Sequence, residues 1–568
     1  MKKLMQWAIA AALICSSTVF TGCSKSDDNQ EPVVKPEQPD DNGANSSSDD
    51  IGYIECSWNG TEVVKTSKVT TARDMSTLSY SSGSVRNTIK ISGFYFISGS
   101  FTTDNYLYVD GWAAIILCDG ADLKVSGIYV NNGGTLIIYA QEKGTGHLYA
   151  ETKYSDDFCP AIGTYVGDGG KVEIHGGNVD AKGGIRSAGI GGGGSDDEHA
   201  NLSDIIIYGG RVYGHSNGGA GIGAGAYDTS VKTNITIYDG LIEGSGGTDV
   251  YKGKFYGVGI GGGHRASFGS VNIYGGTVTA SASDESAGIG AGEEAPNGEG
   301  VVNIYGGTVT AQGGARGAGI GGGDGRRLNE INIHGGEVYA YAGADGAGIG
   351  GGEDGDSGDI NIYGGIVRAY GDRWADGSSN KGYGAGIGSG QNGNVNTIII
   401  KGGDVQARGG MDAAGIGTGE EYGSDINSGT IEIHGGKVWA EGKGYGAGIG
   451  CGEDATFGVL GISGGRVDAH AGSDCGPWSG GIGAYHKGHG ADDNCHIGWA
   501  GWQRIYIGAG MRLWTYSPNV GGVENVTNNL PWWNYVHQRP QVAFDVCDHP
   551  GYTEATCPFC YRETLQLQ

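Results

Sequence analysis

A four-residue motif, Ala-Gly-Ile-Gly, returns along most of this chain and constrains its fold more than any other feature. The motif isoleucines are Ile190, Ile222, Ile289, Ile320, Ile349, Ile387, Ile416 and Ile449, with a Val-Gly-Ile-Gly variant at Ile260. The eight intervals between the first and the last average about 32 residues. A period of this length is typical of one coil of a solenoid, in which each repeat packs only on its neighbours.

Within each repeat, short stretches alternate apolar and polar residues. One example is Ile331-Asn332-Ile333-His334, which a Gly-Gly pair separates from Glu337-Val338-Tyr339-Ala340. Alternation of this kind predicts β-strands, and no stretch has the period of a helix. Three short strands per repeat, joined by glycine turns, predict a parallel β-helix of about a dozen coils. We expect it to be right-handed, because crossovers between parallel strands almost always are.

The repeat also suggests the domain boundaries. We predict that the β-helix covers residues 88–485, with weaker repeats before Ile162. Residues 51–87 should form an N-terminal cap and residues 486–568 a C-terminal cap with a Cys/His-rich tail. Caps are expected because the exposed ends of a β-helix invite edge-to-edge association.

Residues 1–22 are typical of a lipoprotein signal peptide. A basic start, Met1-Lys2-Lys3, precedes an apolar run that is too short to span a bilayer. The sequence Phe20-Thr21-Gly22-Cys23 resembles the lipobox of bacterial lipoproteins, which implies lipidation of Cys23, although Phe replaces the usual Leu. Residues 23–50 are rich in Ser, Asp, Asn and Pro, and they predict a disordered tether.

The start of that tether bears on the location of the protein. The sequence Ser24-Lys25-Ser26-Asp27-Asp28 resembles the acidic surface-export signal of Bacteroidota lipoproteins; the alternative is a plain solvated linker. The resemblance implies a protein that a lipid anchors in the outer membrane and that faces the outside of the cell. No later stretch approaches the roughly 18 to 20 apolar residues of a membrane helix, so we expect membrane contact only through the lipid.

Charge and composition exclude several classes of protein. The formal net charge is −27, which disfavours nucleic acid as a partner because phosphate backbones are repelled. Glycine makes up 118 of 568 residues without a strict Gly-X-Y period, which excludes collagen.

The repeat resembles a known group of proteins. The run "IILCDGADLKVSGIYVNNGGTLIIYAQEKGTGHLYA", followed by "AGIGGG" alternating with stretches such as "VNIYGGTVTA", looks like adhesin-like surface proteins of gut bacteria. The resemblance covers roughly residues 88 to 485. It implies a β-helical fold and a surface role, but it transfers no catalytic residues and names no ligand.

Two long insertions suggest a ligand site. The intervals from Ile222 to Ile260 and from Ile349 to Ile387 are each 38 residues, and both surpluses precede the motif. The two loops should rise from the same edge about 19 Å apart and form the walls of a saddle. The candidate ligand-binding residues on these walls are Tyr251, Phe255, Tyr256, Trp374 and Tyr383. The alternative is two tolerated insertions without function.

A second feature is a column of residues before the Gly-Gly pairs. It consists of His175, Tyr208, Tyr238, Tyr274, Tyr305, His334, Tyr363, Lys401, His434 and Ser463. Rings at the strand spacing can stack on one another or lie flat under sugars, and we favour the stacking interpretation.

Two groups of residues have the chemistry of metal ligands. The tail residues Cys547, His549, Cys557 and Cys560 have a spacing suited to zinc, with disulfides as the alternative in an exported protein. Acidic residues also follow many motifs, and stacked coils should bring their carboxylates together. They are Glu293, Glu294, Asp324, Glu353, Asp354, Glu420, Glu421, Glu453 and Asp454. Calcium is a weaker hypothesis here than a solvated acidic edge.

We therefore expect a non-catalytic surface lipoprotein that acts as an adhesin or binds a polysaccharide or surface glycan. One alternative is a β-helical polysaccharide lyase or glycoside hydrolase, which needs carboxylates that converge in one groove. Another is a structural spacer that presents a metal-binding tail.

Overall fold

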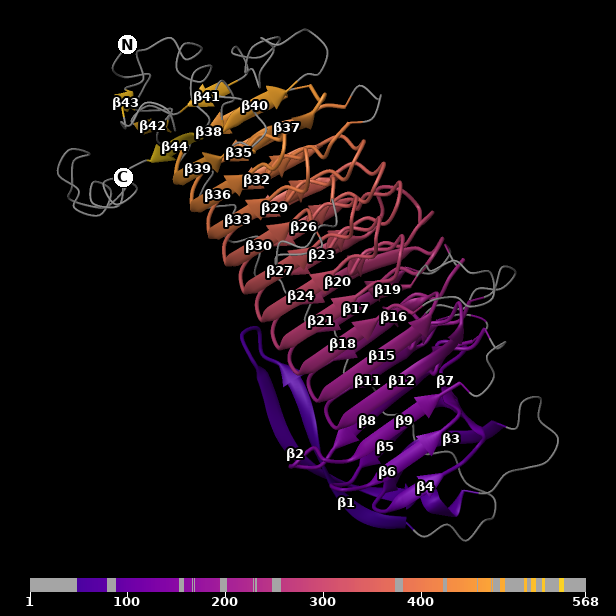
Figure 1. Cartoon of the computed structure of the whole chain (residues 1–568). Coiled ribbons are helices and arrows are strands. Elements are labelled where there is room, and N and C mark those ends of the chain that lie inside the picture. Colours follow the sequence, from indigo (N-terminus) through magenta and orange to yellow (C-terminus); the bar gives the residue numbers. More distant parts are fainter. Residues whose placement is uncertain are drawn as a thin grey trace, which may run out of the picture. The chain divides into compact units, whose positions relative to one another are not determined.

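In the computed structural model, the described residues are 48–78, 88–152, 158–165, 167, 169–194, 202–227, 229, 232–247, 257–372, 382–421, 426–456, 458–470, 472, 481–485, 505–507, 512–516, 524–526 and 541–545. They fold into a right-handed parallel β-helix, so the predicted fold class is confirmed (Figure 1). Among these residues, no helix has the length and apolar character needed to cross a membrane.

Each regular coil contributes one strand to each of three parallel rows. The first row ends at the Gly-Gly corner and comprises β3 (Thr88–Ile97), β5 (Tyr106–Leu117), β8 (Thr135–Ala140), β11 (Lys171–Ile174), β14 (Asp204–Ile207), β17 (Thr233–Ile237), β20 (Phe268–Ile273), β23 (Val301–Ile304), β26 (Glu330–Ile333), β29 (Asp359–Ile362), β32 (Thr397–Ile400), β35 (Thr430–Ile433), β38 (Val459–Ile462) and β41 (Ile505–Ile507). The second row follows the corner and comprises β4 (Ser100–Thr102), β6 (Asp122–Val125), β9 (His147–Glu151), β12 (Asn178–Ile185), β15 (Arg211–Asn217), β18 (Leu241–Ser245), β21 (Thr277–Ser281), β24 (Thr308–Gln312), β27 (Glu337–Tyr341), β30 (Ile366–Tyr370), β33 (Asp404–Arg408), β36 (Lys437–Glu441) and β39 (Arg466–His470).

The third row contains the Ala-Gly-Ile-Gly motifs. It comprises β7 (Gly127–Tyr129), β10 (Ile162–Thr164), β13 (Ile190–Gly192), β16 (Ala220–Gly223), β19 (Val258–Gly261), β22 (Ile289–Gly290), β25 (Ile320–Gly321), β28 (Ile349–Gly350), β31 (Ile387–Gly388), β34 (Ile416–Gly417), β37 (Ile449–Glu453) and β40 (Ile482–Tyr485). Short antiparallel strands follow the last coils, namely β42 (Arg512–Tyr516), β43 (Glu524–Val526) and β44 (Gln541–Asp545), of which β44 pairs with β39.

The register places like residues above one another. Ile304 pairs with Ile333, and Val309 pairs with Val338 in the second row. The interior is therefore built from columns of Ile, Val and Ala, and these four side chains are fully buried. Burying an aliphatic side chain stabilises the fold by about 1.5–3 kcal/mol, and the columns repeat this gain in every coil.

The glycine of each Ile-Gly strand is required by the close contact between coils. In the third row these glycines have φ between 134° and 148°, from Gly163 to Gly483. A Cβ at Gly321 would lie 1.8 Å from the carbonyl oxygen of Gly350. No side chain fits there, which explains why the motif keeps its glycine.

A hairpin of two long strands, β1 (Ser48–Trp58) and β2 (Val63–Asp74), precedes the coils and leads into the 3₁₀ turn η1 (Met75–Thr77). It runs along the side of the coils, in indigo in Figure 1, and does not simply cover their end. The Cys56 backbone N–H donates to His175 Nδ1 at 2.9 Å, and the Trp58 ring stacks on Tyr238 with 5.0 Å between centroids.

Candidate functional site

The Ala-Gly-Ile-Gly motif folds the chain back on itself, and this geometry builds the polar edge of the molecule. In each turn the motif alanine N–H donates to the carbonyl four residues later, as from Ala318 to Gly322 at 2.9 Å. A second backbone hydrogen bond links neighbouring coils. The residue four positions after a motif isoleucine donates its N–H to a backbone carbonyl of the preceding coil, that of the residue four positions before the isoleucine there. Asp324 N donates to Glu285 O at 2.9 Å, for example, and Glu353 N donates to Arg316 O at 2.8 Å.

Two columns of polar side chains therefore run side by side along this edge. The column before the motif contains Glu285, Arg316, Asp345, Tyr383, Asp412 and Tyr445. The column after it contains Glu293, Asp324, Glu353, Gln391, Glu420 and Glu453. The predicted approach of carboxylates in successive coils is confirmed for the pairs Glu293 with Asp324 and Glu420 with Glu453.

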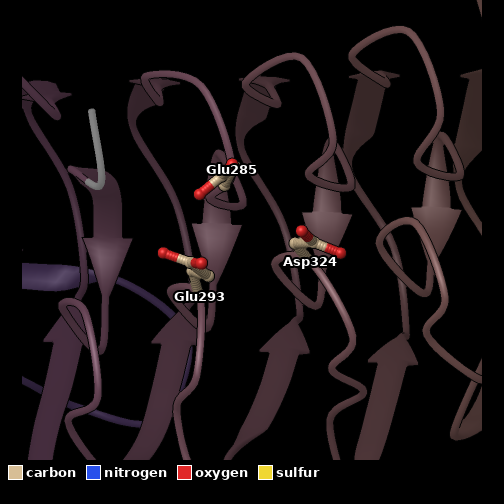
Figure 2. A group of neighbouring side chains, drawn as sticks. All are labelled: Glu285, Glu293 and Asp324. Carbon is tan, nitrogen blue, oxygen red and sulfur yellow. The ribbon is translucent and has the colours of Figure 1, made fainter. Parts of the chain in front are cut away.

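Glu285, Glu293 and Asp324 form the first carboxylate cluster, with oxygens within 4.8 Å of one another (Figure 2). Arg316 partly neutralises it, because its Nη1 lies 3.1 Å from Asp324 Oδ2 and 3.7 Å from Glu285 Oε1. The same guanidinium reaches Glu353 in the next coil, with Nε at 2.9 Å from Oε2. One cation thus holds carboxylates from three successive coils.

The electrostatics of this cluster favour protonated carboxyl groups. Burial, followed by the negative charge of Glu293, raises the pKa of Glu285 to about 7. Burial likewise raises the pKa of Glu353 to about 7 and that of Asp345 to about 6. Glu285 in the cluster and Glu353 beside it therefore keep protons near neutral pH, where an exposed carboxyl group would have lost its proton.

The second carboxylate cluster contains Asp412, Glu420 and Glu453, all of which are buried. The Gln391 side chain donates to Glu420 Oε2 at 3.1 Å, and the Tyr445 backbone N–H donates to Asp412 Oδ1 at 2.9 Å. Carboxylate oxygens gathered in this way are the ligands that divalent cations such as Ca²⁺ prefer. The two clusters are the groups of described residues with the composition and spacing to hold a metal ion.

The sequence indicated only half of this edge. The acidic residues after the motif predicted the second column, whereas no prediction covered Glu285, Arg316, Asp345 and Asp412 of the first. The signal that identifies them is their spacing, since each lies four residues before a motif isoleucine. Their approach to the other column follows from the fold-back of the turn.

Most of the predicted saddle lies outside the described residues, as do Tyr251, Phe255, Tyr256 and Trp374. Tyr383 is described and half-buried in the polar column, where its N–H donates to Ala344 O at 2.7 Å and its carbonyl accepts from Glu420 N at 2.9 Å. The predicted lipidation site Cys23 also lies outside the described part of the chain. The same holds for the predicted metal ligands Cys547, His549, Cys557 and Cys560.

The column before the Gly-Gly corner stacks on itself, as the favoured interpretation predicted. Ring centroids from Tyr274 through Tyr305 and His334 to Tyr363 lie 4.5–4.7 Å apart, with interplanar angles of 2–9°. The Lys401 ammonium covers the last ring at 4.6 Å. Tyr305 and Tyr363 are 40% and 38% exposed, but the stacked neighbours occupy their ring faces. Sugars stack on ring faces, so this column does not offer them a platform.

A different surface presents aromatic groups outward. The aromatic face consists of the outward side chains of β27, β30, β33, β36 and β39, which alternate with buried ones. Its rings belong to Tyr339, Tyr341, Tyr370, Trp439 and His470. The Tyr341 and Tyr370 rings are stacked, with 5.2 Å between their centroids. The Trp439 and His470 rings have 5.5 Å between their centroids and are inclined to each other by 40°.

The charges on the aromatic face balance. Its acidic groups are Glu337, Asp404, Glu441 and Asp468, and its basic groups are Arg368, Arg408, Lys437 and Arg466. Arg368 pairs with Asp404 at 2.8 Å, and Arg408 pairs with Glu441 at 2.8 Å. Burial lowers the pKa of His470, which keeps its ring neutral at pH 7. This face is therefore neutral in a chain of net charge −27, and its rings are half-buried.

Sequence comparison supports the fold. The chain matches the Beta helix repeat model at residues 172–194, 271–293, 302–324, 331–353, 360–391, 398–420 and 431–453. No curated protein and no solved structure matches the chain. The chain is therefore a β-helical repeat protein, a fold that is compatible with adhesins, lyases and hydrolases alike.

Proposed function

We propose that this protein is a non-catalytic surface lipoprotein that binds glycans, as an adhesin does, through the aromatic face. The observation that carries the proposal is the group of outward rings on β27, β30, β36 and β39, from Tyr339 to His470. Adjacent coils lie at the strand spacing of about 4.8 Å, so a polymer that crosses the coils can contact several of these rings. Rings supply stacking area, and the neighbouring guanidinium and carboxylate groups supply hydrogen bonds to hydroxyls.

The charge of the face favours a neutral glycan. The four basic groups are matched by four acidic ones, so no excess of positive charge offsets the repulsion between a polyanion and the rest of the chain. Neutral hydroxyl-rich polymers do not experience this repulsion. Because a binding surface of this kind depends on stacking and hydrogen bonds, its affinity should change little with salt.

The test is a glycan array probed with the lipid-free chain, residues 24–568, followed by titration with the best neutral glycan. We expect the double variant Tyr339→Ala/Trp439→Ala to weaken binding at least tenfold, about 1.4 kcal/mol. Thr279→Ala/Thr310→Ala is the matched control, because these outward threonines lie in the same row, on β21 and β24. The saddle variant Tyr251→Ala/Trp374→Ala is compared in parallel. Loss of binding in that variant alone would move the site from the face to the loops.

A second candidate is polysaccharide cleavage at the first carboxylate cluster and the neighbouring Glu353, and a specific observation favours it. Glu285 and Glu353 have pKa values of about 7, and Arg316 bridges between them. A carboxyl group that keeps its proton near neutral pH, beside an ionised one, is the arrangement that general acid catalysis of glycoside hydrolysis uses. New reducing ends or unsaturated products from a polysaccharide panel, lost in Glu285→Gln and Glu353→Gln, would establish this activity.

A further inference from the structure

The stacked column before the Gly-Gly corner contains the order Tyr-His-Tyr twice. Tyr139 adds one ring at the start of the column, with 4.6 Å between its centroid and that of His175. The covered triplet consists of Tyr139, His175 and Tyr208, and the exposed triplet, farther along the column, consists of Tyr305, His334 and Tyr363. Neighbouring centroids lie 4.6–4.7 Å apart in both triplets. The column thus presents the same side chains, in the same order and at the same spacing, at two places.

The two histidines also occupy equivalent positions in their coils. His175 N donates to Ile138 O at 2.8 Å, and His334 N donates to Ile304 O at 2.7 Å. Each of these isoleucines is fully buried in the preceding coil, so both histidines lie at the outer end of a first-row strand. A group that fits one triplet therefore meets the same ring edges and the same imidazole at the other.

The covered triplet shows what these groups bind, because β1 crosses it as an extended strand. The Tyr53 ring packs on Tyr139, with 4.4 Å between centroids. Three residues later, the Cys56 N–H donates to His175 Nδ1 at 2.9 Å. Under β1, Tyr139 and His175 are only 3% and 7% exposed. An aromatic side chain and a backbone N–H on one extended strand are therefore the complement of this triplet.

The exposed triplet begins where β1 ends. Trp58, the last residue of β1, reaches Tyr274 with 5.3 Å between ring centroids, and the next ring of the column, Tyr305, is 40% exposed. Ile366, just beyond the corner, adds an exposed apolar side chain. Among the described residues, none forms a hydrogen bond with a ring nitrogen of His334. Burial lowers the pKa of His334, so its ring is neutral at pH 7 and one nitrogen accepts hydrogen bonds.

We infer that the exposed triplet binds an extended strand of a partner protein, in the way that the covered triplet binds β1. The partner strand places an aromatic ring on Tyr305 and, three residues later, donates a backbone N–H to His334. The surface directly continues the one that β1 occupies. In a second copy of the chain, β1 is already docked on its own column, so the strand comes from a different protein. One coil beyond the triplet, Lys401 attracts an aromatic or acidic side chain that follows in the partner strand.

The probe is a fluorescein-labelled peptide with the sequence of residues 51–58, IGYIECSW, made with Cys56→Ser to prevent oxidation. It is titrated with the lipid-free chain, residues 24–568, and binding is followed by fluorescence anisotropy. We expect a dissociation constant below about 1 mM, which Tyr305→Ala/His334→Ala should raise at least about tenfold. His334→Phe keeps a stacking ring but removes the acceptor nitrogen, and it should weaken binding about fivefold. A peptide that also carries Tyr53→Ala should bind more weakly than the first peptide.

Tyr339→Ala/Trp439→Ala is the matched control, because it removes two rings from the aromatic face and should bind the peptide normally. This control also separates the strand site from the proposed glycan site. Circular dichroism and the melting temperature verify that every variant keeps the fold. Three results would each overturn the inference: no binding of the peptide, binding that Tyr305→Ala/His334→Ala leaves intact, or self-association of the chain that this double variant abolishes.

Discussion

Adding one methyl group at Gly321 should break the contact between two neighbouring coils. The new Cβ would lie 1.8 Å from Gly350 O and 2.8 Å from Gly350 C, at a backbone φ of 146°. The substitution therefore combines an unfavourable φ for alanine with a steric overlap against rigid backbone. The neighbouring coil has to move by more than an ångström to relieve it.

The expected cost follows from the contacts that this movement breaks. Alanine at a positive φ costs about 1–2 kcal/mol. The hydrogen bonds from Gly322 N to Gly350 O, at 2.9 Å, and from Ile320 N to Gly348 O, at 3.0 Å, cross the same boundary. Each contributes about 1 kcal/mol, and buried groups left unpaired add more. We expect Gly321→Ala to destabilise this part of the solenoid by about 3–5 kcal/mol.

Urea unfolding monitored by circular dichroism measures the effect, and hydrogen exchange localises it to the coils around β25 and β28. Gly325→Ala is the matched control, since its φ is also positive, at 65°, but nothing lies within 4 Å of the added Cβ. The control should lose only the stability that alanine costs at a positive φ, about 1–2 kcal/mol. Equal losses in the two variants, or a loss below about 1 kcal/mol in Gly321→Ala, would refute the reasoning about coil contact.

Other predictions concern the side-chain columns and the acidic edge. Asn332→Ala should lower stability by about 1–2 kcal/mol in urea unfolding, because its side chain bonds Asn residues above and below at 3.0 and 3.1 Å. The melting temperature should fall as the pH rises from about 5 to about 8. The folded-state pKa values of Glu285 and Glu353 are about 7 and exceed the unfolded values. The folded state is therefore stabilised by protons that it loses as the pH rises. Replacing both by Gln should flatten that profile. Chelator should lower the melting temperature above pH 7 by removing calcium from the acidic edge, and an unchanged value would contradict the calcium hypothesis. Trp58→Ala should release the hairpin tip, with faster proteolysis and faster hydrogen exchange in β1.

The residues that face inward made the fold predictable. Interior columns demand the same residue type in every coil, because Ile320 must pack on Ile349 and Val309 on Val338. The sequence therefore repeats with the period of one coil, and the alternation of Val309 and Ala311 with polar residues identifies the strands. The stacked column before the Gly-Gly corner was predictable for the same reason, since each ring packs on its copy in the next coil.

The functional surfaces were less predictable because outward residues need not repeat. On the second row, the position of Thr310 is occupied by Tyr339, Arg368, Gln406 and Trp439 in the next four coils. Nothing in the period marks where such a column becomes aromatic. The carboxylate clusters combine positions on both sides of the motif, and the fold-back of the turn that unites them is visible only in three dimensions.

The N-terminal hairpin lacks the repeat altogether, so the sequence predicted a cap without its shape. Its position depends on single contacts, such as Cys56 with His175 and Trp58 with Tyr238, that link segments more than a hundred residues apart. The hairpin covers the stacked column only as far as Tyr274, and Tyr305 and the rings beyond it are exposed.

The distribution of charge gives each surface of the β-helix a distinct chemistry. Carboxylates gather where the chain folds back at the motif, the aromatic face is balanced, and β2 is positive. Because every coil holds its neighbours in fixed register, these surfaces keep their separation and do not neutralise one another. An acidic edge repels other acidic chains, so association is favoured where the charge is balanced or reversed. The balanced charge of the aromatic face is the reason to propose a neutral glycan there and not a polyanion.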